Sequence, residues 1–227
     1  IFSRLRRRNG VKDMQLSKNV MWVDHPLVQH KLTILRNEKT SSKDFRQLVS
    51  ELVTLEAYEA TRNLTLEEHP IQTPVAPMTG HTLTKNPRPT VIPILRAGLG
   101  MLDGMTRMMP SAEVGFLGMK RDEEHPTQQI TYANRLPDDL SGRQCFLIDP
   151  MLATGGSAVD AINQVKQYNP KSIRFLGIVA APEGLQALQT AHPDVDIICA
   201  ALDEKLNENA YIVPGLGDAG DRIFGTL

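Results

Sequence analysis

The sequence predicts an α/β fold in which a doubly wound, mainly parallel sheet is flanked by helices. In the second half of the chain, β-branched or apolar runs of strand length alternate with segments of helical periodicity. Strands that are separated by helices of this length form parallel βαβ units, whose crossovers cover the faces of one sheet. The chain has 227 residues, of which 41% are hydrophobic, so it can fill the core of one large domain. We expect this single domain to span 21–227.

The N-terminal part of the chain predicts a tail followed by helices. An arginine-rich cluster at 4–8 lacks the apolar stretch that a secretory signal needs. We interpret 1–20 as a disordered or expression-derived tail outside the fold. Helical periodicity begins after Asp24, a candidate N-cap, and Pro26 suits the first turn of that helix.

A second helix is predicted from the capping box that Ser41 and Asp44 form. Apolar residues then recur every three to four positions. The same segment carries Glu51, Glu56 and Glu59, which we expect to be spread around the helix surface. This arrangement argues against a pair of catalytic carboxylates on the helix.

Residues 67–89 predict an edge hairpin or projecting β-arm. They contain five prolines, an alternating run at 71–75 and a Thr79-Gly80 turn. Proline lacks the N–H that a central strand must donate, so it is confined to edges and bulges. Together with the apolar helix at 45–55, this arm favours a homodimer or a higher homo-oligomer.

The strands and helices of the sheet region follow in regular order. Strands are expected at 90–95, 113–118, 143–148, 172–179 and 196–202, and helices in the segments that end at 109, 168 and 191. In an open α/β sheet, ligands bind outside the carboxyl ends of the strands. The segments 96–100, 120–132 and 149–157 are therefore expected to meet at one edge.

One of these segments has the chemistry of a phosphate site. Asp149 ends an apolar strand, and Thr154-Gly155-Gly156-Ser157 follows it at the predicted start of a helix. The first N–H groups of a helix lack intrahelical partners, and the helix dipole favours an anion there. The two glycines let the backbone curl around a phosphate, and the two hydroxyls add donors.

Several other classes of site are disfavoured. Residues 215–220 match G-x-G-x-x-G, but a dinucleotide-binding unit needs about 30 residues and only 221–227 follow. We interpret this segment as a glycine-rich loop that closes over a small planar ligand. Neither a G-x-x-x-x-G-K-[ST] loop nor H-E-x-x-H occurs, and the histidines lack metal-ligand spacing, so we assign no metal-ligating residue.

Charge and cysteine usage limit the partners and the compartment. The net charge of −1 argues against a nucleic-acid surface, and no apolar run approaches the roughly 18 residues of a membrane span. Cys145 and Cys199 lie in apolar runs, so we expect reduced core cysteines and a cytoplasmic protein.

Several segments closely resemble the uracil phosphoribosyltransferase family. Residues 149–157, Asp-Pro-Met-Leu-Ala-Thr-Gly-Gly-Ser, resemble the loop that binds 5-phospho-α-D-ribose 1-diphosphate (PRPP). The similar segments also include 25–28, 58–61, 93–100, 180–184 and 211–221, so that the similarity spans about 24–227. Many phosphoribosyltransferases carry two adjacent acids before this loop; Pro150 in the second place is typical of the uracil branch.

The resemblance implies a fold, a reaction and a set of site residues. The expected fold is phosphoribosyltransferase-like, with a C-terminal hood at about 203–227. Uracil and PRPP would give UMP and diphosphate, with Mg²⁺ carried by PRPP. The implied PRPP contacts are Arg96, Arg121, Asp149, Pro150, Met151, Leu152, Ala153, Thr154, Gly155, Gly156, Ser157 and Asp218. The implied uracil contacts are Ile212, Gly217, Asp218 and Ala219. Asp218 and Arg121 would be the catalytic residues.

Other functions stay open at this point. A regulatory protein of the same fold could sense PRPP while it binds nucleic acid; the near-neutral charge disfavours this, but the arginine cluster at 4–8 leaves it open. The acceptor could also be another base. Some members of the family are activated by GTP, which makes GTP a candidate activator here.

Overall fold

The main sheet is almost entirely parallel, as expected. The computed structural model describes residues 19–121 and 129–226, without the side chains of Arg121 and Gln129. Within them the sheet has nine strands in the order β1-β11-β10-β8-β4-β6-β7, with β5 beside β4 and β9 beside β10. All pairs are parallel except β6 and β7. The strands are β1 (Val20–Trp22), β4 (Thr90–Leu95), β5 (Glu113–Val114), β6 (Phe116–Arg121), β7 (Gln129–Arg135), β8 (Gln144–Ile148), β9 (Met151–Leu152), β10 (Ser172–Ala180) and β11 (Asp196–Leu202).

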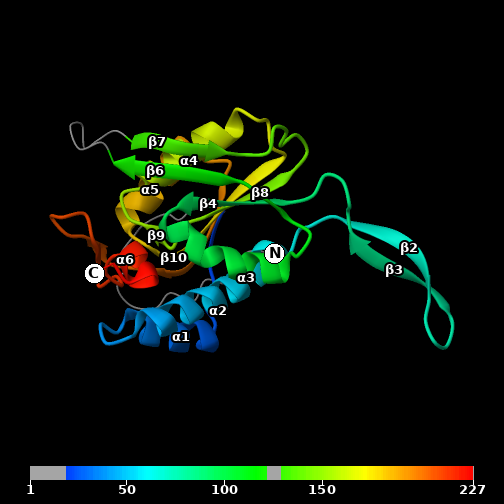
Figure 1. The fold of residues 1–227 in the computed structure, drawn as a ribbon, viewed down its shortest axis with the longest axis horizontal. Helices are drawn as coiled ribbons and strands as arrows, with labels where there is room; N and C mark the ends of the chain where they lie inside the picture. Colours follow the sequence, from blue (N-terminus) through cyan, green and yellow to red (C-terminus); the bar gives the residue numbers. More distant parts are fainter. Residues whose placement is uncertain (1–18, 122–128, 227) are drawn as a thin grey trace.

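Helices cover both faces of this sheet (Figure 1). They are α1 (Pro26–Arg36), α2 (Ser42–Ala60), η1 (Ala97–Met101), α3 (Leu102–Met108), α4 (Gly156–Lys166), α5 (Pro182–Ala191) and α6 (Ala219–Phe224). Alternate strand residues face opposite sides, so Phe146 packs with α1, α2 and α3, whereas its neighbour Leu147 packs with α4 and α5. Two apolar layers therefore enclose the strands, which explains why the strand sequences are apolar on both faces.

The N-terminal boundary and the first cap differ slightly from the expectation. β1 begins at Val20 and pairs with β11, so the fold starts before the end of the segment assigned to a tail at 1–20. Residues 1–18 lie outside the described part. The N-cap of α1 is His25, whose side chain accepts the Leu27 N–H, and not Asp24. The cap of α2 is Ser41, as predicted, and it accepts the Asp44 N–H.

Glu56 corrects the prediction that the glutamates of α2 spread around its surface. Its side chain is fully buried between α2 and the sheet, and neither carboxyl oxygen has a hydrogen-bond partner. Burial raises the pKa of Glu56 well above its usual value, although the nearby Ala200 N–H favours the charged form. The helical spacing of apolar residues does not predict the burial of Glu56, because α2 packs over a wider part of its circumference than its apolar residues occupy.

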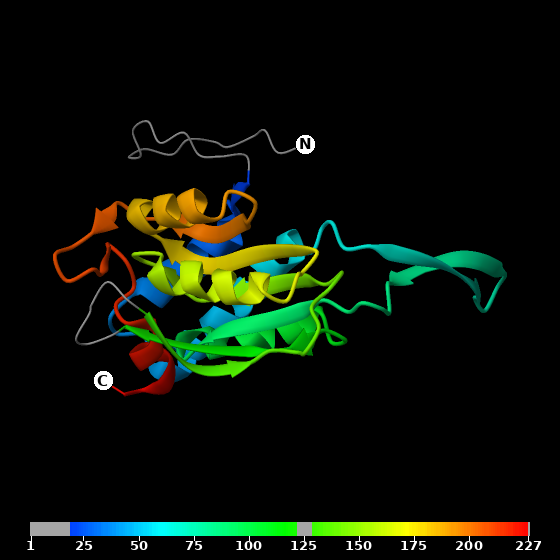
Figure 2. The ribbon, with the colours of Figure 1, turned by 90° about the horizontal axis from the view of Figure 1, so that it is seen from above.

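The predicted β-arm corresponds to a separate hairpin that projects from the body (Figure 2). It consists of β2 (Leu66–Gln72) and β3 (Pro77–Leu83). The turn lies at 73–76 and not at Thr79-Gly80, which pair with β2 inside the hairpin. The Thr73 hydroxyl accepts the N–H groups of the two residues before β3 and thereby closes the turn.

Three short elements complete the C-terminal region. β12 (Lys205–Leu206) and β13 (Ile212–Val213) form an antiparallel pair, and α6 follows. Along the stretches that the structure describes, no helix is both long and apolar enough to cross a membrane.

Candidate active site

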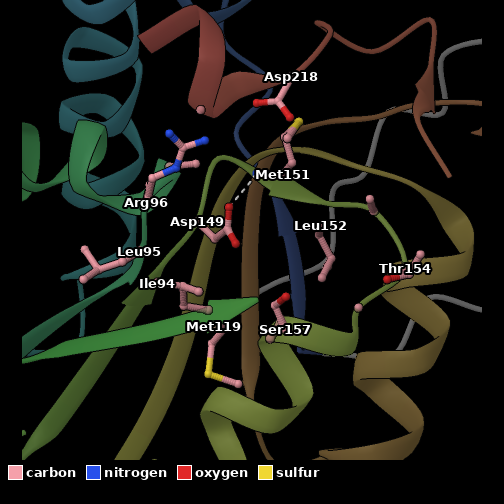
Figure 3. A pocket seen from close by; sticks show the side chains of 15 residues that line it. Ile94, Leu95, Arg96, Met119, Asp149, Met151, Leu152, Thr154, Ser157 and Asp218 are labelled. Carbon is pink, nitrogen blue, oxygen red and sulfur yellow. Dashed lines mark hydrogen bonds between the residues drawn. The ribbon is translucent and has the colours of Figure 1, made fainter. Parts of the chain in front are cut away.

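A pocket of about 270 Å³ lies at the carboxyl ends of β4 and β8, under the terminal segment, residues 203–226 (Figure 3). Its lining comes from 94–97, from 149–158, from Met119 just before the expected segment 120–132, and from the chain end; residues 122–128 of that segment lie outside the described part. The lining residues are Ile94, Leu95, Arg96, Ala97, Met119, Asp149, Met151, Leu152, Ala153, Thr154, Gly155, Ser157, Ala158, Asp218 and Gly220.

The glycine-rich loop is held to the sheet at its start and to a helix at its end. Asp149 directly follows β8, and the Pro150 carbonyl accepts the N–H groups of Ile178 and Val179 in β10. β9 then pairs with the end of β10. These bonds fix the direction in which the loop leaves the sheet, so that 153–157 lie across the pocket.

Two glycines let this loop pack closely against α5. Gly155 is the N-cap of α4 with φ +85°, a left-handed conformation that favours glycine. A Cβ on Gly184 would lie 2.3 Å from the Ala153 carbonyl oxygen, which is shorter than any van der Waals contact. The helix α4 begins at Gly156, inside the Thr154-Gly155-Gly156-Ser157 segment, and directs its first N–H groups towards the pocket.

Arg96 is the cationic group among the described residues of the pocket wall. It follows β4 at a cis Leu95–Arg96 peptide bond and precedes η1. Its side chain is 62% exposed, and its guanidinium lies 3.5 Å from the Asp221 carboxylate. Since that contact is long and solvent-exposed, the guanidinium can turn to an anionic ligand at little cost.

Two carboxylates face the same cavity. Asp149 accepts the Met151 N–H at 3.3 Å, whereas Asp218 caps α6 by accepting the Asp221 N–H at 2.9 Å. Burial and the negative charge of Asp218 raise the pKa of Asp149 to about 7, although the Met151 hydrogen bond lowers it. A ligand with hydroxyl donors or a bound cation would therefore stabilise the ionised form of Asp149.

The predicted contacts are not all in the pocket wall. Among the described lining residues, the terminal segment contributes Asp218 and Gly220; Ile212, Gly217 and Ala219 belong to this segment but do not line the cavity. Pro150 is buried beneath the loop and Gly156 starts α4, and neither lines the cavity. Arg121 ends β6, and its side chain is outside the described part.

Several lining residues, and the contacts that hold the terminal segment, were not predicted from the sequence. Ile94 and Leu95 belong to the wall, because the last residues of β4 as well as the loop after it border the cavity. Asp203, which follows β11, binds Arg36 and the backbone of Gly215. Asp203 follows a strand of the parallel sheet, as Asp149 does, so its place at the carboxyl edge could be predicted. Its partner Arg36 could not, because no local sequence pattern links the two residues.

Within the described ranges, no group of three or more His, Cys, Asp or Glu side chains is arranged to hold a metal ion. The pocket itself offers the carboxylates of Asp149 and Asp218. Two carboxylates suit Mg²⁺ that arrives on a phosphorylated ligand, because this ion keeps several waters and needs few protein ligands.

Comparisons with known proteins agree with this architecture. A family model described as Uracil phosphoribosyltransferase matches residues 22–226. A uracil phosphoribosyltransferase from Bifidobacterium longum subsp. infantis is 64% identical over 208 residues, which cover 90% of this chain and 97% of that protein. Another from Kineococcus radiotolerans is 60% identical over 208 residues, with 90% and 98% covered.

Solved structures give the same result for the fold. The AQ2163 protein from Aquifex aeolicus is 38% identical, with a TM-score of 0.85 over 90% of this chain and 97% of that chain. An adenine phosphoribosyl transferase from Trypanosoma brucei has a TM-score of 0.56 at 12% identity, over 90% of each chain, and so shares the fold alone. Because the family model extends over nearly the whole described chain and relatives of 60% identity or more match its length, this chain belongs to the uracil phosphoribosyltransferase family.

Proposed function

We propose that this enzyme transfers the 5-phosphoribosyl group of PRPP to uracil, with UMP and diphosphate as products, in pyrimidine salvage. The observation that carries the proposal is the pocket in which the N-terminus of α4, Arg96 and the pair Asp149–Asp218 face one cavity. The phosphate, the diphosphate and the ribose of PRPP each have a complementary group there.

The 5-phosphate is assigned to the loop 153–157. Thr154 is exposed at the pocket, Ser157 lines it, and α4 presents its positive end there. The backbone of this loop is already ordered by β10 and α5, so little conformational entropy is lost when the phosphate binds.

The diphosphate is assigned to Arg96, and the ribose hydroxyls to Asp149. A guanidinium stays charged at all relevant pH values and can donate to two phosphate oxygens at once. Mg²⁺ on the diphosphate would neutralise the charge of the leaving group. Asp149 and Asp218 are the pocket carboxylates that would bind this ion through its water ligands. Arg121 is assigned to the same diphosphate from the family resemblance.

Uracil is assigned to the terminal segment, with Ile212, Gly217, Asp218 and Ala219 as its contacts. Cleavage at C1 of the ribose develops oxocarbenium character, so the protein mainly has to position the base, hold the leaving diphosphate and exclude water. Backbone donors and acceptors can reject cytosine, because its amino group would leave buried polar atoms unpaired. Asp218 is a pocket-lining carboxylate of the terminal segment, and it is assigned a catalytic role from the family resemblance.

A coupled assay tests the reaction. The protein would be mixed with Mg²⁺, PRPP and one base at a time, and both the nucleotide and diphosphate would be measured. We expect UMP and diphosphate with uracil. Product with orotate or hypoxanthine but none with uracil would refute the proposal.

The β-arm supports a homodimer or a higher homo-oligomer as the working form. Its apolar side chains Leu66, Ile71, Val75, Met78 and Leu83 are exposed, and Val75 is 93% exposed. An isolated two-stranded hairpin is only marginally stable in water, so these side chains need a cover, which a second copy can supply. Replacing Ile71 and Met78, which pair across the hairpin, with lysine should lower the mass measured by light scattering, while Thr73→Ser should not.

The compartment and the activator complete the proposal. Cys145 and Cys199 are both free and buried, which suits the reducing cytoplasm. GTP is proposed as an activator from the family resemblance, and initial rates with and without GTP test this directly.

A further inference from the structure

A partly buried ion pair joins the end of α1 to the start of the terminal segment. Arg36 donates from Nη1 to Asp203 Oδ2 at 2.7 Å and from Nη2 to Oδ1 at 2.6 Å. The Asp203 side chain is 5% exposed and that of Arg36 is 23% exposed. Bidentate pairs of this kind fix the relative orientation of the two groups as well as their distance.

The ion pair also takes up both backbone groups of Gly215. Arg36 Nη1 donates to the Gly215 carbonyl oxygen at 2.6 Å, and the Gly215 N–H donates to Asp203 Oδ2 at 2.9 Å. Gly215 has φ +63°, and a Cβ there would lie 2.1 Å from the Ile212 carbonyl oxygen. The peptide groups on both sides of this residue are therefore held in one orientation, three residues before Asp218.

A second guanidinium ties the next residue to the same place. Arg222 in α6 donates to the Leu216 carbonyl oxygen at 2.8 Å and to that of Asn37 at 2.6 Å, and it lies over the Phe45 ring at 4.4 Å. Asn37 directly follows Arg36. The end of α1 consequently anchors two successive residues of the terminal segment from outside the pocket.

We propose that Arg36, acting through Asp203, is a positioning residue that sets the affinity and selectivity for the base. The proposal rests on the proposed function, in which the terminal segment contacts uracil. Neither side chain lines the pocket, so Arg36 acts on the base only by holding Gly215 and the residues up to Asp218. Lysine cannot replace it, because one ammonium group cannot serve two carboxylate oxygens and a carbonyl in this fork geometry.

Steady-state kinetics of Arg36→Lys and Asp203→Asn test the inference. A misplacement of about 1 Å in an active site can cost about 100-fold, so we expect the KM for uracil to rise at least about tenfold in both variants. The KM for PRPP should stay within about twofold, because the loop 153–157 is anchored by β10 and α5. The ratio of kcat/KM for uracil over cytosine should fall, and amide hydrogen exchange at 215–218 should accelerate.

Arg174→Lys is the matched control. Arg174 is also a buried arginine that binds a carboxylate, that of Asp196, and a backbone carbonyl, that of Ala60, but it lies at the start of β10, away from the pocket. Its replacement should lower Tm as the Arg36 substitution does. It should leave the KM for uracil and the base selectivity unchanged.

Two results would overturn the inference. One is an Arg36→Lys enzyme that loses stability like Arg174→Lys but keeps the KM for uracil and the selectivity of the parent enzyme. The other is an equal rise in the KM values for uracil and PRPP, which would indicate general loosening. Asp218→Asn separates these from a failure of the proposed function: if it also leaves uracil kinetics unchanged, the terminal segment is not the base site.

Discussion

Replacing Asp149 with asparagine removes a carboxyl group whose ionised form is disfavoured in the folded protein. Burial, followed by the charge of Asp218, raises the pKa of Asp149 from 3.8 to about 7. A raised pKa in the folded state means that folding favours the protonated form. The energetic penalty is absent below the unfolded pKa, grows as the pH rises from about 4 to 7, and is constant above the folded pKa.

The size of the effect follows from the shift. About 3 pKa units at 1.36 kcal/mol each correspond to about 4 kcal/mol, which is an upper bound. Asp149 is partly exposed, so solvent screening reduces the expected value to about 2 kcal/mol. Asparagine has nearly the same shape and no charge, so Asp149→Asn should become more stable than the parent protein as the pH rises.

Urea unfolding of the ligand-free protein between pH 4 and 8, at one protein concentration and without phosphate, measures this difference. Asp194→Asn is the control of opposite sign, because the hydrogen bond from Lys166 lowers the pKa of Asp194. That pair stabilises the protein above the unfolded pKa and loses its effect as the pH falls.

A stability difference between Asp149→Asn and the parent that does not change with pH, or that reverses as the pH rises, would refute the reasoning. The same substitution should weaken the binding of PRPP although it stabilises the fold. Asparagine cannot offer the ribose hydroxyls a carboxylate, so Mg²⁺ and PRPP should raise the Tm of the parent much more than that of the variant. In the parent enzyme, kcat/KM for PRPP should rise with pH through about 7.

Three further substitutions address the core, the loop and the pocket wall. Glu56→Leu should raise the free energy of unfolding by about 1–3 kcal/mol in urea titrations, because it removes a buried carboxyl without a partner; a less stable variant would contradict this. Gly184→Ala should lower stability by about 1–3 kcal/mol and raise the KM for PRPP, since the new Cβ would displace the Ala153 carbonyl, and an unchanged KM would count against the assigned phosphate loop. Arg96→Lys should raise the KM for PRPP by about tenfold or more, whereas Arg107→Lys, at an exposed ion pair in α3, should not; equal effects would remove Arg96 from the diphosphate site.

Local patterns predicted the elements whose contacts are local or repeat along the chain. The strands at 90–95 and 196–202 coincide with β4 and β11, because their β-branched and apolar runs are buried on both faces. Ser41 caps α2 as its capping box indicates. In these cases the residues that decide the structure lie within a few positions of one another.

The errors arose where two local signals competed or where packing overrode a period. A Thr-Gly pair and a Thr-Pro-Val-Ala stretch both suit a turn, and the pairing of the two arm strands selected the second, at 73–76. Glu56 lies on the buried side of α2 although its residue type is one of the most exposed. Its burial depends on how closely α2 packs against β10 and β11. The spacing of apolar residues along the helix does not encode this packing.

The sequence by itself predicted a glycine-rich turn between a strand and a helix at the carboxyl edge of the sheet, because a strand, an acid, two glycines and two hydroxyls follow one another within a few residues. It also determined the family, through motifs distributed along the chain. Only the tertiary structure decided what surrounds that loop. Asp149 and Asp218 share one cavity, and Arg36 binds Asp203 across 167 residues of sequence, because the order of strands in the sheet and the return of the chain end bring them together. The physical reason is that charge interactions and hydrogen bonds depend on distance in space, whereas sequence patterns record distance along the chain.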